Sequence, residues 1–302
     1  MGVLRYPNVA GTFYPADPRT LAAQVRAYAR LGPDGGPLSG GPTSSAAPER
    51  WTDKEKEAGT GTGSRKGADA PGGSGPGRWP KALIVPHAGY LYSGPVAGSA
   101  YAQLAAGTAA IHRVVLLGPS HRLPFYGLAY SQAEAFVTPL GQVPVDREAY
   151  TAIADLPQAR AFEAPFQGEH CLEVQLPFLQ VLLEDFRLVP FLVGEASTAE
   201  VAEVLERLWG GDETLILVSS DLSHYLNYAT ARRLDAATSQ AIVALDPAAV
   251  GDDQACGRIP VKGLLRAARH HGLQCQVLDL RNSGDTAGPR DQVVGYGAFA
   301  FG

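Results

Sequence analysis

Residues 81–94 read KALIVPHAGYLYSG, in which a short apolar run stops at a proline and a histidine follows at once. Residues 82–85 are all apolar, which is typical of a strand that is buried on both faces of a sheet. Pro86 has no backbone N–H to give to a sheet, so we expect the strand to end there. His87 then lies just beyond a core strand, the place where open α/β sheets hold their ligands.

Apolar runs of the same kind alternate with helical patterns along the rest of the chain. Further strands are expected at 113–118, 187–194, 214–220, 274–280 and 293–301, with amphipathic helical segments between most of them. Such alternation is typical of helices packed on both faces of one sheet. The sequence therefore predicts an α/β protein, a three-layer α/β/α sandwich with a mostly parallel or mixed central sheet.

The 302 residues are 45% hydrophobic, enough for one large core. Residues 32–79 break the pattern, because they are crowded with Gly, Pro, Ser and Thr and offer almost nothing to bury. We expect a single α/β domain over residues 1–302, interrupted at 32–79 by a disordered insertion.

Composition argues against several classes of partner. The net charge is −5, so no global basic field favours nucleic acid or an anionic membrane. No apolar run approaches the roughly 18 residues of a membrane span. The three cysteines are odd in number and form no CxxC pair, which argues for a reducing, cytoplasmic environment.

Polar side chains follow three of the expected strands. His87 follows the first, His121 follows residues 113–118, and Asp221 with His224 follows residues 214–220. Neighbouring parallel strands end at the same edge of a sheet, so these side chains would meet there if the strands are adjacent. Imidazole and carboxylate groups suit metal binding or proton transfer.

Two more stretches carry candidate site residues. GEHCLEVQLPFL sets His170 and Glu173 three apart on one face of a helix start, where they could bind metal, orient a ligand, move a proton, or simply cap the helix with an ion pair. Cys256 precedes another helix, whose N-terminus would lower the thiol pKa and favour a thiolate ligand or nucleophile. The alternative for Cys256 is a small buried apolar residue.

Other catalytic classes lack their signatures. The chain has no GxGxxG, GxxxxGK[ST] or GxSxG motif. Ser219 and Ser220 lie beside Asp221 and His224, but their spacing differs from that of a nucleophile elbow. A thiol enzyme, with Cys256 as nucleophile and His224 as base, is a further alternative.

Several stretches resemble the Memo family, including its bacterial and archaeal members called AmmeMemoRadiSam system protein B. They cover almost the whole chain outside residues 32–79, and they read AGTFYPAD, VPHAGYLYSGPVA, LLGPSHR, EHCLEVQLPFL, VSSDLSHY, CGRIPV, NSGDT and VVGYGAFAF. The resemblance implies one α/β domain similar to the class III, non-haem-iron extradiol dioxygenases.

The resemblance also implies roles for particular residues. The metal ligands would be His87, His121 and Cys256, with Asp221 as the nearby acidic group and His224 as the proton-transfer group. The cleft around them, as substrate-binding or supporting residues, would include Tyr90, Tyr92, His170 and Glu173.

Two histidines and one anionic ligand leave open positions on iron, while a thiolate also suits copper or zinc. We therefore expect Fe(II) first, with copper or zinc as alternatives. The leading hypothesis is a redox enzyme of dioxygenase type that acts on an unidentified small molecule. The alternative is a metal-handling or peptide-binding module without turnover, and the family name implies association with radical-SAM and AMMECR1-type proteins.

Overall fold

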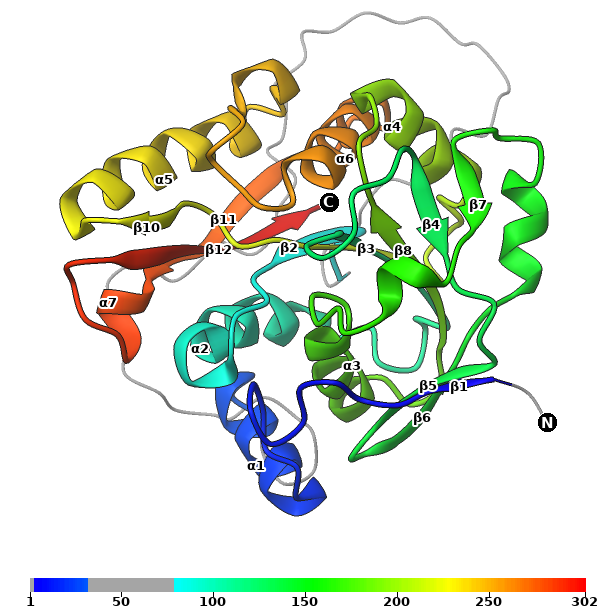
Figure 1. Cartoon of the computed structure of the whole chain (residues 1–302), viewed down its shortest axis with the longest axis horizontal. Coiled ribbons are helices and arrows are strands. Elements are labelled where there is room, and N and C mark those ends of the chain that lie inside the picture. The colour runs from blue at the N-terminus through cyan, green and yellow to red at the C-terminus, as the bar shows by residue number, and fades with distance from the viewer. Residues whose placement is uncertain (1–2, 32–78) are drawn as a thin grey trace, which may run out of the picture.

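The computed structural model describes residues 3–31 and 79–302 (Figure 1). The insertion predicted at 32–79 therefore lies outside the described residues, apart from Trp79. Trp79 packs partly buried against the core, and its indole N–H donates a hydrogen bond of 3.3 Å to the carbonyl oxygen of Asp212.

A nine-stranded mixed sheet forms the centre of the molecule, which confirms the predicted fold class. Its order is β10-β12-β2-β9-β3-β8-β4-β7, with β11 paired to β12. The four strands in the middle of this order are mutually parallel, and antiparallel pairs flank them on both sides. The strands are β2 (Ala82–Val85), β3 (Arg113–Pro119), β4 (Leu128–Tyr130), β7 (Ala159–Ala161), β8 (Arg187–Val193), β9 (Thr214–Ser219), β10 (His224–Leu226), β11 (Cys275–Asn282) and β12 (Val293–Phe301).

The middle strands are apolar along nearly their whole length because helices cover both faces of the sheet. All four residues of β2 and all six of β9 are buried. On one face lie α4 (Thr198–Arg207), α5 (Tyr228–Val243) and α6 (Arg258–His270), and on the other lie α1 (Pro18–Tyr28), α2 (Tyr90–Tyr101) and α3 (Leu176–Leu182) (Figure 1).

The helix ends follow local sequence signals. The Asp17 carboxylate accepts a hydrogen bond of 2.8 Å from the Thr20 backbone N–H at the start of α1. Ser197 and Glu200 form a capping box at the start of α4, each side chain accepting from the other's backbone N–H. Pro177 lies in the first turn of α3, where a proline displaces no helical hydrogen bond.

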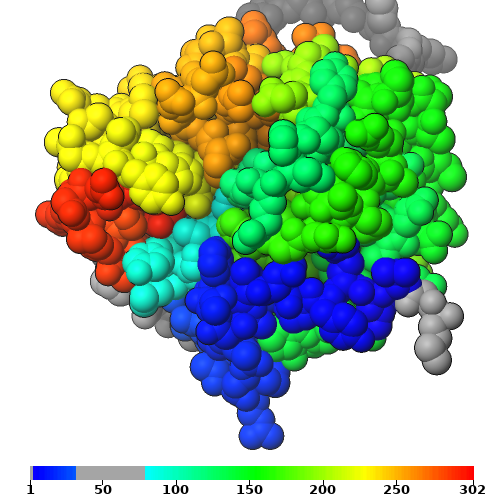
Figure 2. Space-filling model, in the orientation of Figure 1, coloured from blue at the N-terminus to red at the C-terminus, as the bar shows by residue number. Residues whose placement is uncertain are grey.

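A smaller three-stranded sheet joins β1 (Leu4–Arg5), β5 (Ala135–Thr138) and β6 (Gly141–Pro144). The N-terminal segment runs from β1 to α1 over the outside of the molecule, across the region of α3 (Figure 2). Short helical segments complete the described chain: α7 (Ser283–Thr286) and the 3₁₀ turns Ala102–Leu104, Glu148–Ile153, Ala164–Phe166, Glu173–Gln175 and Pro247–Ala249. In residues 3–31 and 79–302 no helix has both the length and the apolar character needed to cross a bilayer.

Candidate metal centre

The order β2-β9-β3 brings the three predicted strand ends together. These strands are parallel, so all three end at the same edge of the sheet. His87 follows β2, Asp221 follows β9, and His121 follows β3. The condition on which the sequence argument depended, that these strands are neighbours, therefore holds.

Three histidines gather at this edge: His87, His121 and His170. One ring nitrogen from each lies within 4.8 Å of the others. The ring centroids are 5.1 to 5.6 Å apart, with the rings of His121 and His170 stacked and that of His87 perpendicular to both. Such a spacing allows one metal ion to contact all three rings.

The hydrogen bonds around Ser219 determine which nitrogen of His87 is available. The Ser219 hydroxyl donates to the Cys171 carbonyl oxygen at 2.6 Å and accepts from the Gln175 amide at 2.8 Å. It also lies 2.9 Å from His87 Nδ1, so the imidazole must donate its Nδ1–H to this hydroxyl. His87 Nε2 is left with a lone pair. Burial, and then the electrostatic effect of His121 and His170, holds the pKa of the His87 ring well below its ordinary value.

Glu169 orients the other two histidines. One carboxylate oxygen lies 3.0 Å from His121 Nδ1 and 3.3 Å from His170 Nδ1, and backbone N–H groups of His121, His170 and Cys171 also donate to the carboxylate. Burial alone would raise the pKa of Glu169, but the hydrogen bonds from His121, the electrostatic interaction with its ring, and the backbone bond from Cys171 lower it to about 2. A carboxylate that fixes imidazole rings from behind is a common support of metal sites.

Cys256 adjoins the three histidines without belonging to their group of nitrogens. Its Sγ lies 3.2 Å from His87 Nε2 and 3.6 Å from the Asp221 carbonyl oxygen. The expectation of a lowered thiol pKa was wrong. Burial, and then the charge of Asp221, raise the pKa of Cys256 to about 12 and outweigh the helix N-terminus.

Asp221 and His224 lie beside the cluster. Asp221 is buried and accepts a hydrogen bond of 2.7 Å from the His87 backbone N–H, and burial raises its pKa to about 7. Burial also lowers the pKa of His224. A hydrogen bond with the Leu222 backbone acts against this effect, and the electrostatic effect of His121 adds to it. His224 precedes a register shift at which the exposed Tyr225 takes a left-handed backbone conformation with φ of 57°. Such strain is typical of functional sites.

Glu173 lies apart from the three histidines. Its two oxygens accept hydrogen bonds from the backbone N–H groups of Asn8 and Val9 and from the Tyr14 hydroxyl, at 2.6 to 3.0 Å. Glu173 therefore holds the N-terminal segment in place. A supporting role beside the cleft stays a prediction for this residue. That segment in turn brings the Phe13 ring edge-on to His170, with centroids 4.8 Å apart.

Tyr90 and Tyr92, both in the stretch of residues 81–94, differ in their burial. Tyr90 is buried in the core and donates to the Val174 carbonyl oxygen at 2.7 Å, so a supporting role beside the cleft stays a prediction for this residue. Tyr92 is 38% exposed and remains available.

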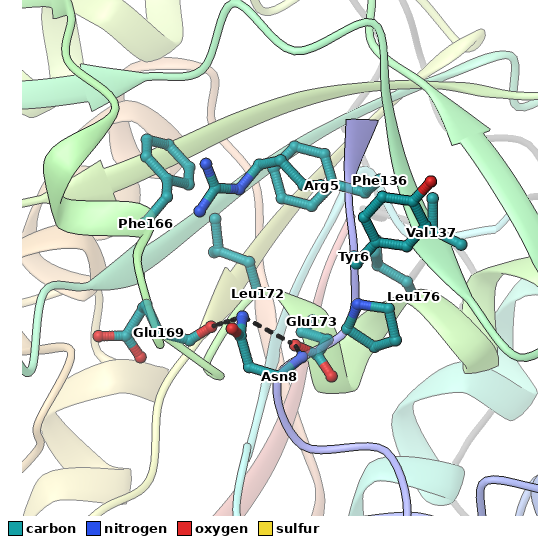
Figure 3. A pocket seen from close by; sticks show the side chains of 11 residues that line it. Arg5, Tyr6, Asn8, Phe136, Val137, Phe166, Glu169, Leu172, Glu173 and Leu176 are labelled. Carbon is teal, nitrogen blue, oxygen red and sulfur yellow. Dashed lines mark hydrogen bonds between the residues drawn. The ribbon is translucent and has the colours of Figure 1, made fainter. Parts of the chain in front are cut away.

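A small pocket lies beneath the N-terminal segment, with about 20 Å³ of free space (Figure 3). Arg5 crosses it between the rings of Phe136 and Phe166, while Asn8 bridges Glu169 and Glu173. The volume suits about one water molecule rather than a substrate. Glu169 lines this pocket and also contacts the histidines, so the pocket couples the N-terminal segment to the candidate centre.

Two residues that organise this centre, Glu169 and Ser219, were not predicted from the sequence as parts of a metal site. Glu169 directly precedes His170, but the helical spacing of His170 and Glu173 drew attention to Glu173 instead. Ser219 was weighed only as a nucleophile, although its hydroxyl proton is committed to a carbonyl group. No spacing rule in the sequence indicates these roles of Glu169 and Ser219. Their contacts with His121, Cys171 and His87 join residues at least 48 positions apart.

The fold and this edge of the sheet define an α/β sandwich with a candidate metal centre built from histidines. Residues 68–300 match the family model described as Memo-like protein. The chain is 30% identical to a MEMO1 family protein of Archaeoglobus fulgidus, over 99% of both chains. It is 33% identical to one from Saccharolobus solfataricus (99% of both) and 35% identical to one from Aeropyrum pernix (98% of both). The chain therefore belongs to the Memo family.

Proposed function

We propose that this protein binds one redox-active transition-metal ion at the histidine cluster and uses it for oxygen-dependent chemistry on a small molecule. The observation that carries the proposal is the set of three imidazoles whose nitrogens lie within 4.8 Å of one another. The Nδ1 atoms of His87 and His121 lie 2.9 and 3.0 Å from oxygens of Ser219 and Glu169 that can accept their protons, which leaves both Nε2 lone pairs for a metal. The Cys256 thiol, 3.2 Å from His87 Nε2, would have to make way for the ion or bind it as well.

His87 and His121 are ligands in any version of this proposal. The third is either His170, which the distances favour, or Cys256, which the family resemblance implies. Burial raises the pKa of the Cys256 thiol to about 12, which opposes the deprotonation that a thiolate ligand requires. We therefore assign the third position to His170 and keep Cys256 as the alternative.

Fe(II) is the proposed ion, with copper or zinc as alternatives, because imidazole suits all three metals. Bound iron would supply open coordination positions for oxygen and a chelating substrate.

Side chains of the protein would donate and accept the protons of the reaction. His224 is the proposed general acid and base, since imidazole can change charge near neutral pH. Asp221, whose pKa is raised to about 7, can hold or release a proton in the same range. Its hydrogen bond to the His87 backbone also sets the turn that carries His87.

The test is anaerobic loading with Fe(II), followed by oxygen-uptake measurement with a broad panel of catechol-like compounds. Uptake above that of His87→Ala, and reduced at least tenfold in His224→Gln with iron content unchanged, supports the proposal. A protein that retains iron but consumes no oxygen across the panel would instead be a metal-handling or partner-binding module. Retention of neither iron nor copper defeats both functions.

A further inference from the structure

A second group of metal-binding side chains lies at the far end of α6. Glu206 comes from the last turn of α4, His270 ends α6, and His271 caps it. Cys256, which adjoins the candidate metal centre, lies just before the start of this 13-residue helix, and the second group lies at its end. At 1.5 Å per residue the helix separates the two groups by about 20 Å. The two groups are therefore independent in space.

The geometry points to a binding site for one divalent transition-metal ion of the zinc class, held by Glu206, His270 and His271. His270 Nδ1 lies 2.8 Å from one carboxylate oxygen of Glu206, and His271 Nε2 lies 2.7 Å from the other. The three ligand atoms lie within 4.8 Å of one another. Two imidazoles and a carboxylate leave a fourth position for water, a ligand set that zinc accepts.

The surrounding structure holds His271 in place. Its ring stacks on Trp209, with centroids 4.0 Å apart and planes 2° from parallel. Gly272 follows with a φ of 68°, a left-handed conformation that ends the helix immediately after the two histidines. A ligand that is fixed before binding loses little conformational freedom when the metal arrives.

The helix dipole also favours a cation at this position. The carboxyl end of α6 carries the negative end of the helix dipole. Arg207 and Arg266 line an adjacent hollow of about 390 Å³, together with Glu203. The charge of Arg207 is offset by paired hydrogen bonds to Asp155 at 3.1 and 3.0 Å, and the hollow gives an ion access from solvent.

Metal binding requires only a change of tautomer in the two rings. Without metal, each imidazole can donate its proton to Glu206; with metal, that proton moves to the other ring nitrogen. His270 is 73% exposed on its side chain, so it can adjust to the slightly wider spacing of a metal site.

The test uses tag-free, EDTA-treated full-length protein carrying His87→Ala and His121→Ala, which silences the first centre. Calorimetric titration with Zn²⁺ should show one bound ion, and adding His270→Ala or His271→Ala should raise the dissociation constant at least tenfold. His112→Ala, which alters an exposed histidine outside both groups, should leave the dissociation constant unchanged. Circular dichroism checks the fold of each variant.

Absence of zinc binding in the doubly substituted background, or a dissociation constant unaffected by both His270→Ala and His271→Ala, would overturn the proposal. The result is independent of the first centre, because the background lacks two of its histidines. Co²⁺ provides a second readout: this site offers no sulfur, so its cobalt spectrum should lack the thiolate charge-transfer band that Cys256 could give.

Discussion

His87 Nδ1 lies 2.9 Å from the Ser219 hydroxyl, whose own proton is already given to the Cys171 carbonyl oxygen. A buried hydroxyl group with one proton must accept its other hydrogen bonds. The serine therefore forces the proton of His87 onto Nδ1 and the lone pair onto Nε2. A side chain that never touches the metal would thus determine whether this imidazole can bind one.

Replacing Ser219 by alanine should weaken metal binding while preserving the fold. Without the hydroxyl, the His87 proton is free to occupy Nε2, and loss of such a supporting bond typically costs 10-fold to 100-fold in affinity. Fe(II) or Zn²⁺ titration of metal-free protein measures the effect. Ser99→Ala, which removes a hydroxyl from α2, is the matched control. An unchanged dissociation constant in Ser219→Ala would show that the serine does not set the tautomer.

Glu169 should make the stability of the metal-free protein sensitive to acid. Its folded pKa of about 2 lies below the ordinary value of 4.5, so its contribution is complete above about pH 4.5 and is lost as the pH falls through 2. The difference amounts to about 3 kcal/mol. Urea unfolding of wild type and Glu169→Gln at pH 6 and pH 3 should show the gap between them shrinking at the lower pH. A constant gap contradicts the assignment.

Glu173 should stabilise the N-terminal segment rather than bind metal. Glu173→Gln replaces an acceptor by a donor that faces the Asn8 and Val9 N–H groups, and we expect a loss of about 2 kcal/mol of unfolding free energy. Limited proteolysis should cut residues 3–17 faster, with metal affinity changed less than in His170→Ala. Glu184→Gln, an exposed change, is the control. Equal proteolysis of variant and wild type would rule out this anchoring role.

The contact between α1 and α2 depends on a glycine. A Cβ on Gly98 would lie 2.2 Å from the Tyr28 backbone oxygen, which cannot move aside as a side-chain tip could. Gly98→Ala should therefore cost about 2 kcal/mol of stability despite the better helix propensity of alanine. Thermal unfolding measures this, with Ser99→Ala in the same helix as control. A rise in melting temperature would show that the helices separate without penalty.

The sequence predicted the layered fold well because the middle strands are apolar on both faces and few architectures accept such strands. It also predicted that His87, His121 and Asp221 follow those strands. Their convergence required the order β2-β9-β3, which periodicity does not encode.

Roles that depend on long-range contacts were harder to predict from the sequence. Glu173 was singled out by its spacing from His170, yet its partners Asn8 and Tyr14 come from the opposite end of the chain. The pKa of Cys256 was expected to follow the helix N-terminus, whereas burial beside Asp221 dominates. Sequence position gives the local dipole but not the depth of burial.

The proposed centre is tested most sharply by Fe(II) binding when the α6 site is silenced by His270→Ala. Tag-free, EDTA-treated protein in this background is titrated anaerobically with Fe(II), alongside His87→Ala, His170→Ala and Cys256→Ala. We expect one ion per chain, a dissociation constant raised at least tenfold by His87→Ala and His170→Ala, and a smaller rise for Cys256→Ala. Unaltered binding in His87→Ala would contradict the proposed centre, and unaltered binding in His170→Ala with loss in Cys256→Ala would transfer the third position to the thiolate.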